Sequence, residues 1–195
     1  MMFKRILLTG CMITGFASAA FAGVEGSAIF NDITGGNADV SHAGGLYTPT
    51  TARSRVNYSS KYKPGSVIVD TRAKYLYLVE KGGKAMRYGI GTARPGFEWG
   101  GSLRISRKAK WPSWTPTANM RKRMPGLPIT MKGGITNPLG ARALYLGTTL
   151  YRIHGTNEGW TIGGAVSSGC IRLHNKDVED LYERVKVGTR VVVLR

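Results

Sequence analysis

Residues 66–91 read SVIVDTRAKYLYLVEKGGKAMRYGIG, and this stretch decides the fold class. It contains three short runs rich in β-branched and aromatic residues, at 66–70, 75–79 and 86–91. Residues 80–84, EKGGK, supply a turn between the second and third runs. Short apolar runs separated by glycine-containing turns are typical of consecutive β-hairpins. The stretch therefore predicts a β-meander within a mainly β domain.

The chain downstream adds two strands, one helix and a final strand. Residues 143–146 and 150–153 are apolar and aromatic, which predicts two strands. Apolar residues at helical spacing over 175–185, with Asn175 as the expected N-cap, predict the principal helix. Residues 189–194 predict a last buried strand. We therefore expect a single β-rich domain, a mixed sheet or sandwich, with one principal helix.

A long irregular segment is expected between the meander and these later elements. It contains KWPSWTP at 110–116 and MPGLP at 124–128, whose four prolines exclude a regular central strand. We call residues 110–128 the Trp-Pro loop. Long ordered loops are often functional, so we expect this one to cover an active-site cleft. Basic residues surround this loop and are expected either to attract an anionic partner or to form an ordinary solvated surface. They are Arg104, Arg107, Lys108, Lys110 and residues 121–123.

The N-terminal segment, residues 1–22, has the pattern of an export signal. Two basic residues precede a largely apolar, uncharged stretch at 6–21, and Ala20 and Ala22 are the small residues that a signal peptidase reads. We expect cleavage after Ala22 and a location in the periplasm or cell envelope. The alternatives are a retained anchor, for which the stretch is short, and lipidation of Cys11, whose preceding apolar region is also short.

Residues 23–64 show no sustained helical or strand period and are rich in Gly, Ser, Asn, Thr and Ala. They predict a polar, flexible tether. The folded domain is then expected to run from about Gly65 to Arg195, an ordinary size for one domain.

The chain is strongly basic. It carries 28 Lys and Arg against 11 Asp and Glu, which gives a formal net charge of +17. Such a charge favours anionic partners: nucleic acid, a membrane surface or an acidic wall polymer. The export signal and the lack of a nucleic-acid-binding motif in the sequence argue against nucleic acid. The sequence also lacks a P-loop and a dinucleotide-binding glycine motif.

Once the export signal is removed, Cys170 is the only cysteine of the chain. Residues 153–173, IHGTNEGWTIGGAVSSGCIRL, place His154 upstream of it. A thiol is a weak nucleophile until it loses its proton, and imidazole is the side chain best suited to remove that proton near neutral pH. Gly169 leaves room for a substrate carbonyl. Backbone N–H groups around Ser168, Gly169 and Cys170 are candidates for an oxyanion hole.

Plainer interpretations of the same residues stay open. A lone cysteine is often an inert core residue, and a histidine at a strand end is often a satisfied polar group. Arg172, two residues after Cys170, could serve only in an ordinary ion pair rather than at a substrate. A Zn²⁺ site of Cys170, His154 and His174 lacks an evident fourth ligand. Because the thiol would do the covalent chemistry itself, we expect neither a metal nor an organic cofactor.

The segment resembles the active-site motif of the L,D-transpeptidases. In that family a His followed by Gly or Ser precedes a Ser-x-Gly-Cys element, and here His154 and Gly155 precede SSGC at 167–170 by a similar spacing. CIRL at 170–173 is similar to the ErfK/YbiS-like branch, and NPLG at 137–140 resembles the segment before the histidine-bearing strand. The resemblance covers roughly Gly65 to Arg195 and implies a YkuD-type catalytic domain.

The resemblance implies a reaction on peptidoglycan. Cys170 would attack the carbonyl between the L-centre of meso-diaminopimelate and the following D-Ala of a tetrapeptide stem, release D-Ala and form a thioester. An amine of a second stem, or of an outer-membrane protein or lipoprotein, would then take the acyl group. His154 would act as base and then acid, with the Gly155 carbonyl orienting its other ring nitrogen. Carbapenems would acylate the same thiol.

Three more residues are expected at the substrate. Arg172 would hold a stem carboxylate, which suits its bidentate guanidinium. Trp160 would form a hydrophobic wall. Ser168 stands where many family members carry a second His, so its side chain would not share the proton transfer and the dependence on His154 would be greater.

Two other functions stay open. Water in place of the amine would make the chain an L,D-carboxypeptidase or endopeptidase, and a non-catalytic wall-binding module would need no nucleophile. The presence of both His154 and Cys170 argues against the module. The expected partners are peptidoglycan stem peptides and an acceptor protein. We expect a monomer that binds no nucleic acid and is not an integral membrane protein.

Overall fold

The computed structural model describes residues 51–195. The expected export signal, Cys11 and residues 23–50 of the expected tether lie outside the described residues. Within residues 51–195, no helix is long and apolar enough to span a membrane.

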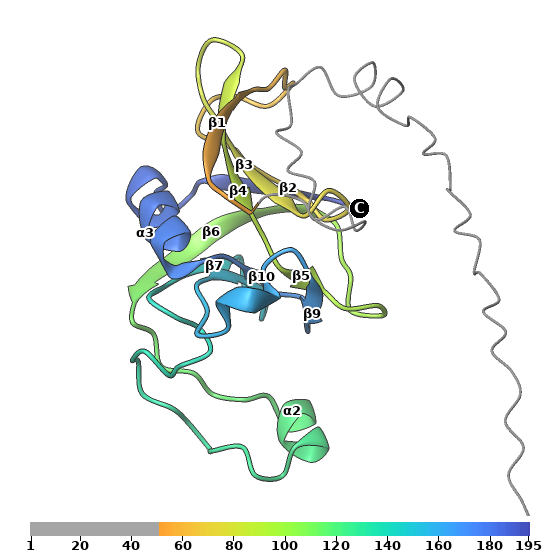
Figure 1. Cartoon of the computed structure of the whole chain (residues 1–195), viewed down its shortest axis with the longest axis vertical. Helices are drawn as coiled ribbons and strands as arrows, with labels where there is room; N and C mark the ends of the chain where they lie inside the picture. The colour runs from red at the N-terminus through yellow and green to blue at the C-terminus, as the bar shows by residue number, and fades with distance from the viewer. Residues whose placement is uncertain (1–50) are drawn as a thin grey trace, which may run out of the picture. The chain divides into compact units, whose positions relative to one another are not determined.

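The described chain is built on one mixed sheet of nine strands, and Figure 1 shows how its elements are arranged. The strand order is β1-β4-β3-β2-β11-β6-β7-β8-β10. The bounds are β1 Ser54–Asn57, β2 Val67–Asp70, β3 Tyr75–Val79, β4 Lys84–Gly89, β6 Gly101–Lys110, β7 Arg142–Leu146, β8 Arg152–His154, β10 Ile171–Arg172 and β11 Arg190–Leu194. β2 runs parallel to β11 and β8 parallel to β10, whereas the other neighbours are antiparallel. A separate parallel pair is formed by β5 (Thr92–Ala93) and β9 (Ala165–Ser167). The predicted mainly β fold is confirmed.

The meander predicted from residues 66–91 is also confirmed. Strands β2, β3 and β4 pair in chain order, with Leu76 of β3 opposite Tyr88 of β4. The turn between β3 and β4 contains Gly82 and Gly83, whose φ angles are 70° and 67°. These angles lie in the left-handed region that glycine adopts readily, which is why the EKGGK segment turns the chain here.

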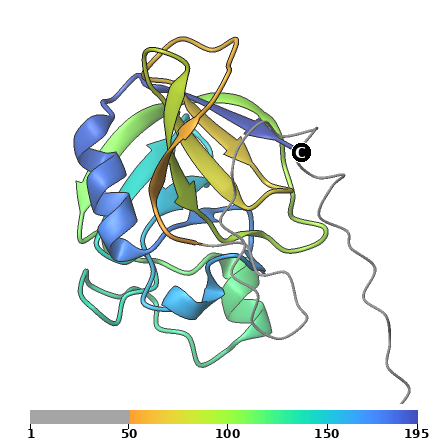
Figure 2. The ribbon, with the colours of Figure 1, turned by 45° about the horizontal axis from the view of Figure 1, so that its top comes forward.

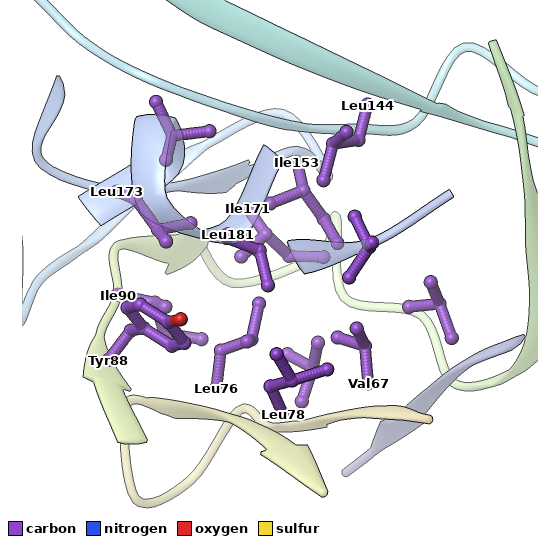
Figure 3. Packing of buried hydrophobic residues seen from close by; sticks show 14 of the residues in the cluster. Val67, Leu76, Leu78, Tyr88, Ile90, Leu144, Ile153, Ile171, Leu173 and Leu181 are labelled. Carbon is purple, nitrogen blue, oxygen red and sulfur yellow. The ribbon is translucent and has the colours of Figure 1, made fainter. Parts of the chain in front are cut away.

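The hydrophobic core lies between this meander and strands β7, β8 and β10 (Figure 3). Leu76 and Tyr88 face Ile153 of β8 and Ile171 of β10, and each of the four side chains is at most 2% exposed. Burial of an aliphatic or aromatic side chain of this size contributes about 1.5–3 kcal/mol. Helix α3 (Asn175–Arg184) packs against β7 and β8 (Figure 2). Its buried residues include Leu181. It is the predicted principal helix.

Strand β6 lies in the segment for which the sequence pattern predicted irregular structure, and that prediction is wrong. Most of its side chains are basic or small, and only Ile105 is buried. Its backbone pairs with β11 on one side and β7 on the other. The Lys108 ammonium donates to the carbonyl oxygens of Tyr182 and Val185, at 2.5 and 2.7 Å. Pairing with two neighbours, rather than apolar alternation, holds this strand in place.

The structure adds a short helix and an early strand. Helix α2 (Ala118–Arg123) lies inside the Trp-Pro loop, and the side-chain oxygen of Thr117 accepts the Met120 N–H at 3.2 Å as its N-cap. Strand β1 lies within the expected tether and pairs with β4. The sheet therefore begins before the predicted boundary near Gly65.

Asn175 is not the N-cap of α3, contrary to the prediction. His174 occupies the cap position without a side-chain cap bond, and Asn175 is the first helical residue. Its side-chain Oδ1 instead accepts the N–H groups of Ala141 and Thr156, at 3.0 and 3.2 Å. This amide joins the start of α3 to the segments that flank β7 and β8.

Candidate active site

Strands β8 and β10 lie side by side at one edge of the sheet and run in the same direction. Ile171 is level with Ile153, and Arg172 is level with His154. Both isoleucines belong to the core. Because side chains alternate along a strand, His154 and Arg172 project from the opposite face.

Arg152 and Cys170 lie two residues before His154 and Arg172, so the same alternation places their side chains on the same face as those two residues. We call Arg152, His154, Cys170 and Arg172 the reactive face. His154 and Cys170 are diagonal neighbours across the strand pair. The parallel pairing therefore brings together two residues that are well separated in the chain.

A tight turn presents Cys170 at the start of β10. The buried Ser167 hydroxyl donates to the Cys170 carbonyl at 2.5 Å and accepts the Gly169 N–H at 3.1 Å. Gly169 has a φ of 109°, and a Cβ on it would lie 2.5 Å from a ring carbon of Tyr151. The Trp99 indole N–H donates to the Gly169 carbonyl at 2.7 Å and its ring stacks on Tyr151 at 4.3 Å. Glycine is thus required at this position for both backbone conformation and space.

Ser167 is a site residue that sequence reasoning missed. Ser167 and Ser168 are adjacent, and only the pairing of β9 decides that Ser167 turns inward while Ser168 stays partly exposed. The Gly169 N–H is occupied by Ser167. The candidate oxyanion donors are therefore reduced to the N–H groups of Ser168 and Cys170.

The Cys170 thiol is partly buried, and its Sγ lies 3.8 Å from the Leu150 carbonyl oxygen. Burial raises the pKa of this thiol above its ordinary value, and the positive charges of Arg152 and Arg172 oppose that effect without cancelling it. The thiol is therefore protonated near neutral pH.

His154 is 4% exposed, and its Nδ1 lies 2.5 Å from the Gly155 carbonyl oxygen. A carbonyl oxygen only accepts, so we infer that Nδ1 carries the hydrogen and that Nε2 is the free acceptor. Burial lowers the pKa of His154 to about 3, with the Gly155 carbonyl opposing and the nearby arginines adding to the effect. The imidazole is uncharged at neutral pH and able to accept a proton. A Cβ on Gly155 would overlap the Asn175 Oδ1, so this position also requires glycine.

The two arginines of the reactive face have different surroundings. The Arg172 guanidinium forms an ion pair with Glu158 at 2.8 Å and lies 3.4 Å from the Thr161 hydroxyl. Arg152 was missed by sequence reasoning, although its place two residues before His154 in a predicted strand put it on the same face. Its Nη1 donates to the Leu150 carbonyl at 3.2 Å.

The two other predicted substrate residues lie at the surface. Trp160 is in the short 3₁₀ turn η1 (Gly159–Thr161) and is 81% exposed. Ser168 is partly exposed in the turn before Cys170.

A cavity of about 480 Å³ is lined by Gly169, Ile171, Trp99 and Lys74 among others. Neither Cys170 nor His154 lines it, and no residue of the Trp-Pro loop does. It is therefore not the cleft that was expected beneath that loop.

Across the part of the chain that the structure describes, no three His, Cys, Asp or Glu side chains are arranged to hold a metal ion. His174 lies at the start of α3.

Comparisons with known proteins identify the family of this chain. The L,D-transpeptidase catalytic domain model, YkuD, matches residues 64–193. Probable L,D-transpeptidase YbiS of Escherichia coli (strain K12) is 40% identical over 132 residues, covering 64% of this chain and 43% of YbiS. Probable L,D-transpeptidase ErfK/SrfK of the same strain is 48% identical over 94 residues, covering 46% of this chain and 30% of that protein. The chain thus spans less than half the length of these two relatives.

A solved structure is similar over a longer stretch. It is a Brucella melitensis protein described as a probable carnitine operon oxidoreductase, 45% identical, with a TM-score of 0.51. The match covers 75% of this chain and 95% of that chain. The family model covers most of the described residues, and the chain belongs to the L,D-transpeptidase family, in its ErfK/YbiS branch, with a YkuD catalytic domain.

Proposed function

We propose that this chain is a peptidoglycan L,D-transpeptidase of the cell envelope that works through a thioester on Cys170. The observation that carries the proposal is the reactive face. A buried, uncharged imidazole whose Nδ1 is held by the Gly155 carbonyl is the diagonal neighbour of a cysteine. A positioned base beside a thiol is what nucleophilic acyl transfer requires.

In the first half of the reaction, Nε2 of His154 takes the thiol proton while Sγ attacks the carbonyl carbon between meso-diaminopimelate and D-Ala. The S–C bond forms, and the N–H groups of Ser168 and Cys170 stabilise the oxyanion. The C–N bond then breaks, and the imidazolium returns the proton to the leaving amine. D-Ala departs and the stem remains as a thioester. Because the free thiol is protonated, this proton transfer accompanies the attack on bound substrate.

In the second half, an amine attacks the thioester carbonyl. Nε2 takes a proton from this amine, the new C–N bond forms, and the C–S bond breaks as the sulfur regains a proton. An amine from the side chain of a second stem gives a 3→3 cross-link. An amine of an outer-membrane protein or lipoprotein gives a protein attached to the wall. Water in the same place gives hydrolysis, which is the second candidate activity.

The remaining expected substrate residues fit this scheme in different ways. Trp160 offers an exposed aromatic surface against which a stem can pack. Arg172 is already paired with Glu158, with which a stem carboxylate would compete. The net charge of +17 favours a polyanionic wall. Export through residues 1–22 into the periplasm belongs to the same proposal.

The test is a reaction of the purified full chain with a disaccharide-tetrapeptide, followed by mass spectrometry of the products. Release of D-Ala together with a cross-linked dimer supports transpeptidation, and the tripeptide alone supports hydrolysis. Transfer of the stem to a protein amine supports attachment. Retained wall binding with no reaction in either the wild type or Cys170→Ala would support a binding module and contradict the proposal.

Carbapenems offer a second readout of the same chemistry. A carbapenem is expected to acylate Cys170 and to raise the intact mass of the protein by one drug molecule. An unchanged mass on a reduced, folded protein would count against the assignment of the nucleophile.

An oxidoreductase function, as in the description of the Brucella protein, has no dinucleotide-binding glycine motif to support it in this sequence.

A further inference from the structure

Arg152 is the cation of the reactive face that has no carboxylate partner. Within residues 51–195 it forms no ion pair, whereas Arg172 is paired with Glu158. Its Nε is buried without a hydrogen-bond partner. A partly buried charge without a counter-ion is unfavourable, so this guanidinium is suited to a ligand that brings a negative charge.

Neighbouring strands hold this guanidinium in place. Tyr145 of β7 is directly opposite Arg152, and the guanidinium carbon lies 5.2 Å from the centre of the Tyr145 ring. Arg107 of β6 lies over the same ring at 3.6 Å. Arg107, Tyr145 and Arg152 thus form a row across three strands, and the row leads to Cys170, which immediately precedes β10. Arg107 is exposed and lies at the far end of the row from the thiol.

The Leu150 carbonyl limits the distance between Arg152 and the thiol. Its oxygen lies 3.2 Å from Arg152 Nη1 and 3.8 Å from Cys170 Sγ. The separation of Nη1 and Sγ therefore cannot exceed the sum of these two distances. A charged donor that can bind a carboxylate at two points thus lies close to the proposed nucleophile.

The proposed donor substrate carries a carboxylate at a matching position. In a stem that ends in D-Ala, the terminal carboxylate carbon is three bonds from the scissile carbonyl carbon, so the two atoms are separated by less than about 4 Å. In a reactive complex the sulfur lies about 3–3.5 Å from that carbonyl carbon. The carboxylate is thus within reach of a guanidinium held this close to the sulfur by the shared Leu150 carbonyl.

We propose that Arg152 binds the terminal carboxylate of the acyl donor and so selects stems that end in a free D-Ala. The proposal rests on the proposed function, because it assumes attack by Cys170 on the bond before that residue. The carboxylate leaves with D-Ala, which frees the guanidinium before the acceptor arrives. A donor whose D-Ala is amidated or extended by another residue lacks this anion.

The enzymatic test compares a tetrapeptide donor with the same donor ending in D-alaninamide. In the wild type, kcat/KM is expected to favour the free carboxylate by about tenfold or more, the size of a charge-assisted hydrogen bond. Arg152→Gln should bring the ratio close to one by lowering kcat/KM for the carboxylate donor alone. Arg152→Lys should restore part of the preference. Arg107→Gln, which removes the other cation of the same row, should keep the wild-type ratio.

A second test needs no peptidoglycan substrate. Iodoacetate and iodoacetamide alkylate the same thiol, but only iodoacetate carries a carboxylate next to the reacting carbon. The ratio of their alkylation rates at Cys170 should fall about tenfold or more in Arg152→Gln and stay unchanged in Arg107→Gln. Because each rate is divided by that of the neutral reagent, a change in thiol pKa cancels.

The outcomes separate the two proposals. If the wild type releases no D-Ala but the alkylation ratio falls as expected, the proposed function fails while anion binding by Arg152 stands. If Arg152→Gln slows both donors equally, or Arg107→Gln alters the ratios as much, Arg152 is not a carboxylate-binding residue. An unchanged alkylation ratio in Arg152→Gln would also overturn the proposal.

Discussion

The two faces of the β8–β10 strand pair differ in what they contribute. On the core face, Ile153 and Ile171 are almost fully buried among other apolar side chains. The reactive face, one residue away along each strand, carries a thiol, an imidazole and two guanidinium groups. The two-residue period of a strand thus separates stability from chemistry within a few residues. Substitutions on the core face should therefore lower stability, whereas substitutions on the reactive face should lower activity.

Cys170→Ala should have the largest effect on activity. Loss of the proposed nucleophile is expected to lower the rate of D-Ala release by at least about 10³-fold. The free energy of unfolding should change by less than about 1 kcal/mol, because the thiol is only partly buried and its contact with the Leu150 carbonyl is long, at 3.8 Å. Product analysis and urea unfolding of the same preparation measure both. Full activity in this variant would refute the assignment of the nucleophile.

His154→Gln should have the second largest effect on activity. Loss of a general base is expected to lower kcat by about 10²–10⁴-fold. Asn157→Gln, a change at a residue bonded through its side chain to the Thr136 carbonyl, serves as a control of similar kind away from the reactive face. Steady-state kinetics checks the difference, and equal rates in the wild type and His154→Gln would show that another group moves the proton.

Ile153→Ala tests the core face. Removal of a fully buried isoleucine side chain is expected to lower the free energy of unfolding by about 2–5 kcal/mol. Leu150→Ala, just before the same strand at a position 67% exposed, should lower it by less than about 0.5 kcal/mol. Urea unfolding monitored by tryptophan fluorescence compares them. Similar losses of stability in both variants would contradict the burial of Ile153 and the exposure of Leu150 that the structure shows.

The pH dependence of stability reports on His154. Its pKa is near 6.5 in the unfolded chain and about 3 in the native protein. Between these values the unfolded chain binds a proton that the native protein does not, so stability is full above pH 6.5 and falls as the pH is lowered. The slope from this group reaches about 1.4 kcal/mol per pH unit. Urea midpoints from pH 7 to 4 should fall less steeply in His154→Gln than in the wild type, and equal slopes would contradict a buried, uncharged imidazole.

Glu158→Gln should have the smallest effect. The Glu158 side chain is 41% exposed, and an ion pair of this kind contributes less than about 1 kcal/mol to stability. Thermal unfolding should therefore change little, while Arg172 loses its charged partner. A drop in stability of several kcal/mol would show that this pair is a structural element of the 158–161 turn.

The sequence predicted the apolar parts of the fold well and the charged parts poorly. The meander, β7, β8, β11 and α3 follow from their own apolar patterns. Strand β6 did not, because its stability comes from backbone pairing with β7 and β11 and from basic side chains that lie along the surface. Asn175 looked like a cap by its place in the sequence, but its amide is used by distant N–H groups at Ala141 and Thr156. Pairings of this kind leave no local signal.

The candidate site shows the same division. His154, Gly155 and Cys170 could be predicted because spacing and resemblance mark them. The inward turn of Ser167, the occupied Gly169 N–H and the ion pair of Arg172 depend on how β9 and the 158–161 turn pack, which no spacing rule gives. Arg152 shares a face with His154 by simple alternation, so its place was accessible from the sequence. Its lack of a carboxylate partner was not.

The most direct measurement is the identification of the acyl-enzyme. The full chain is mixed with disaccharide-tetrapeptide, quenched in acid at short times, and analysed by intact mass and peptide mapping. The account predicts an adduct with the mass of the stem less D-Ala, located on the peptide that contains Cys170 and absent from Cys170→Ala. Release of D-Ala without an adduct at any time, or an adduct on another residue, would contradict it.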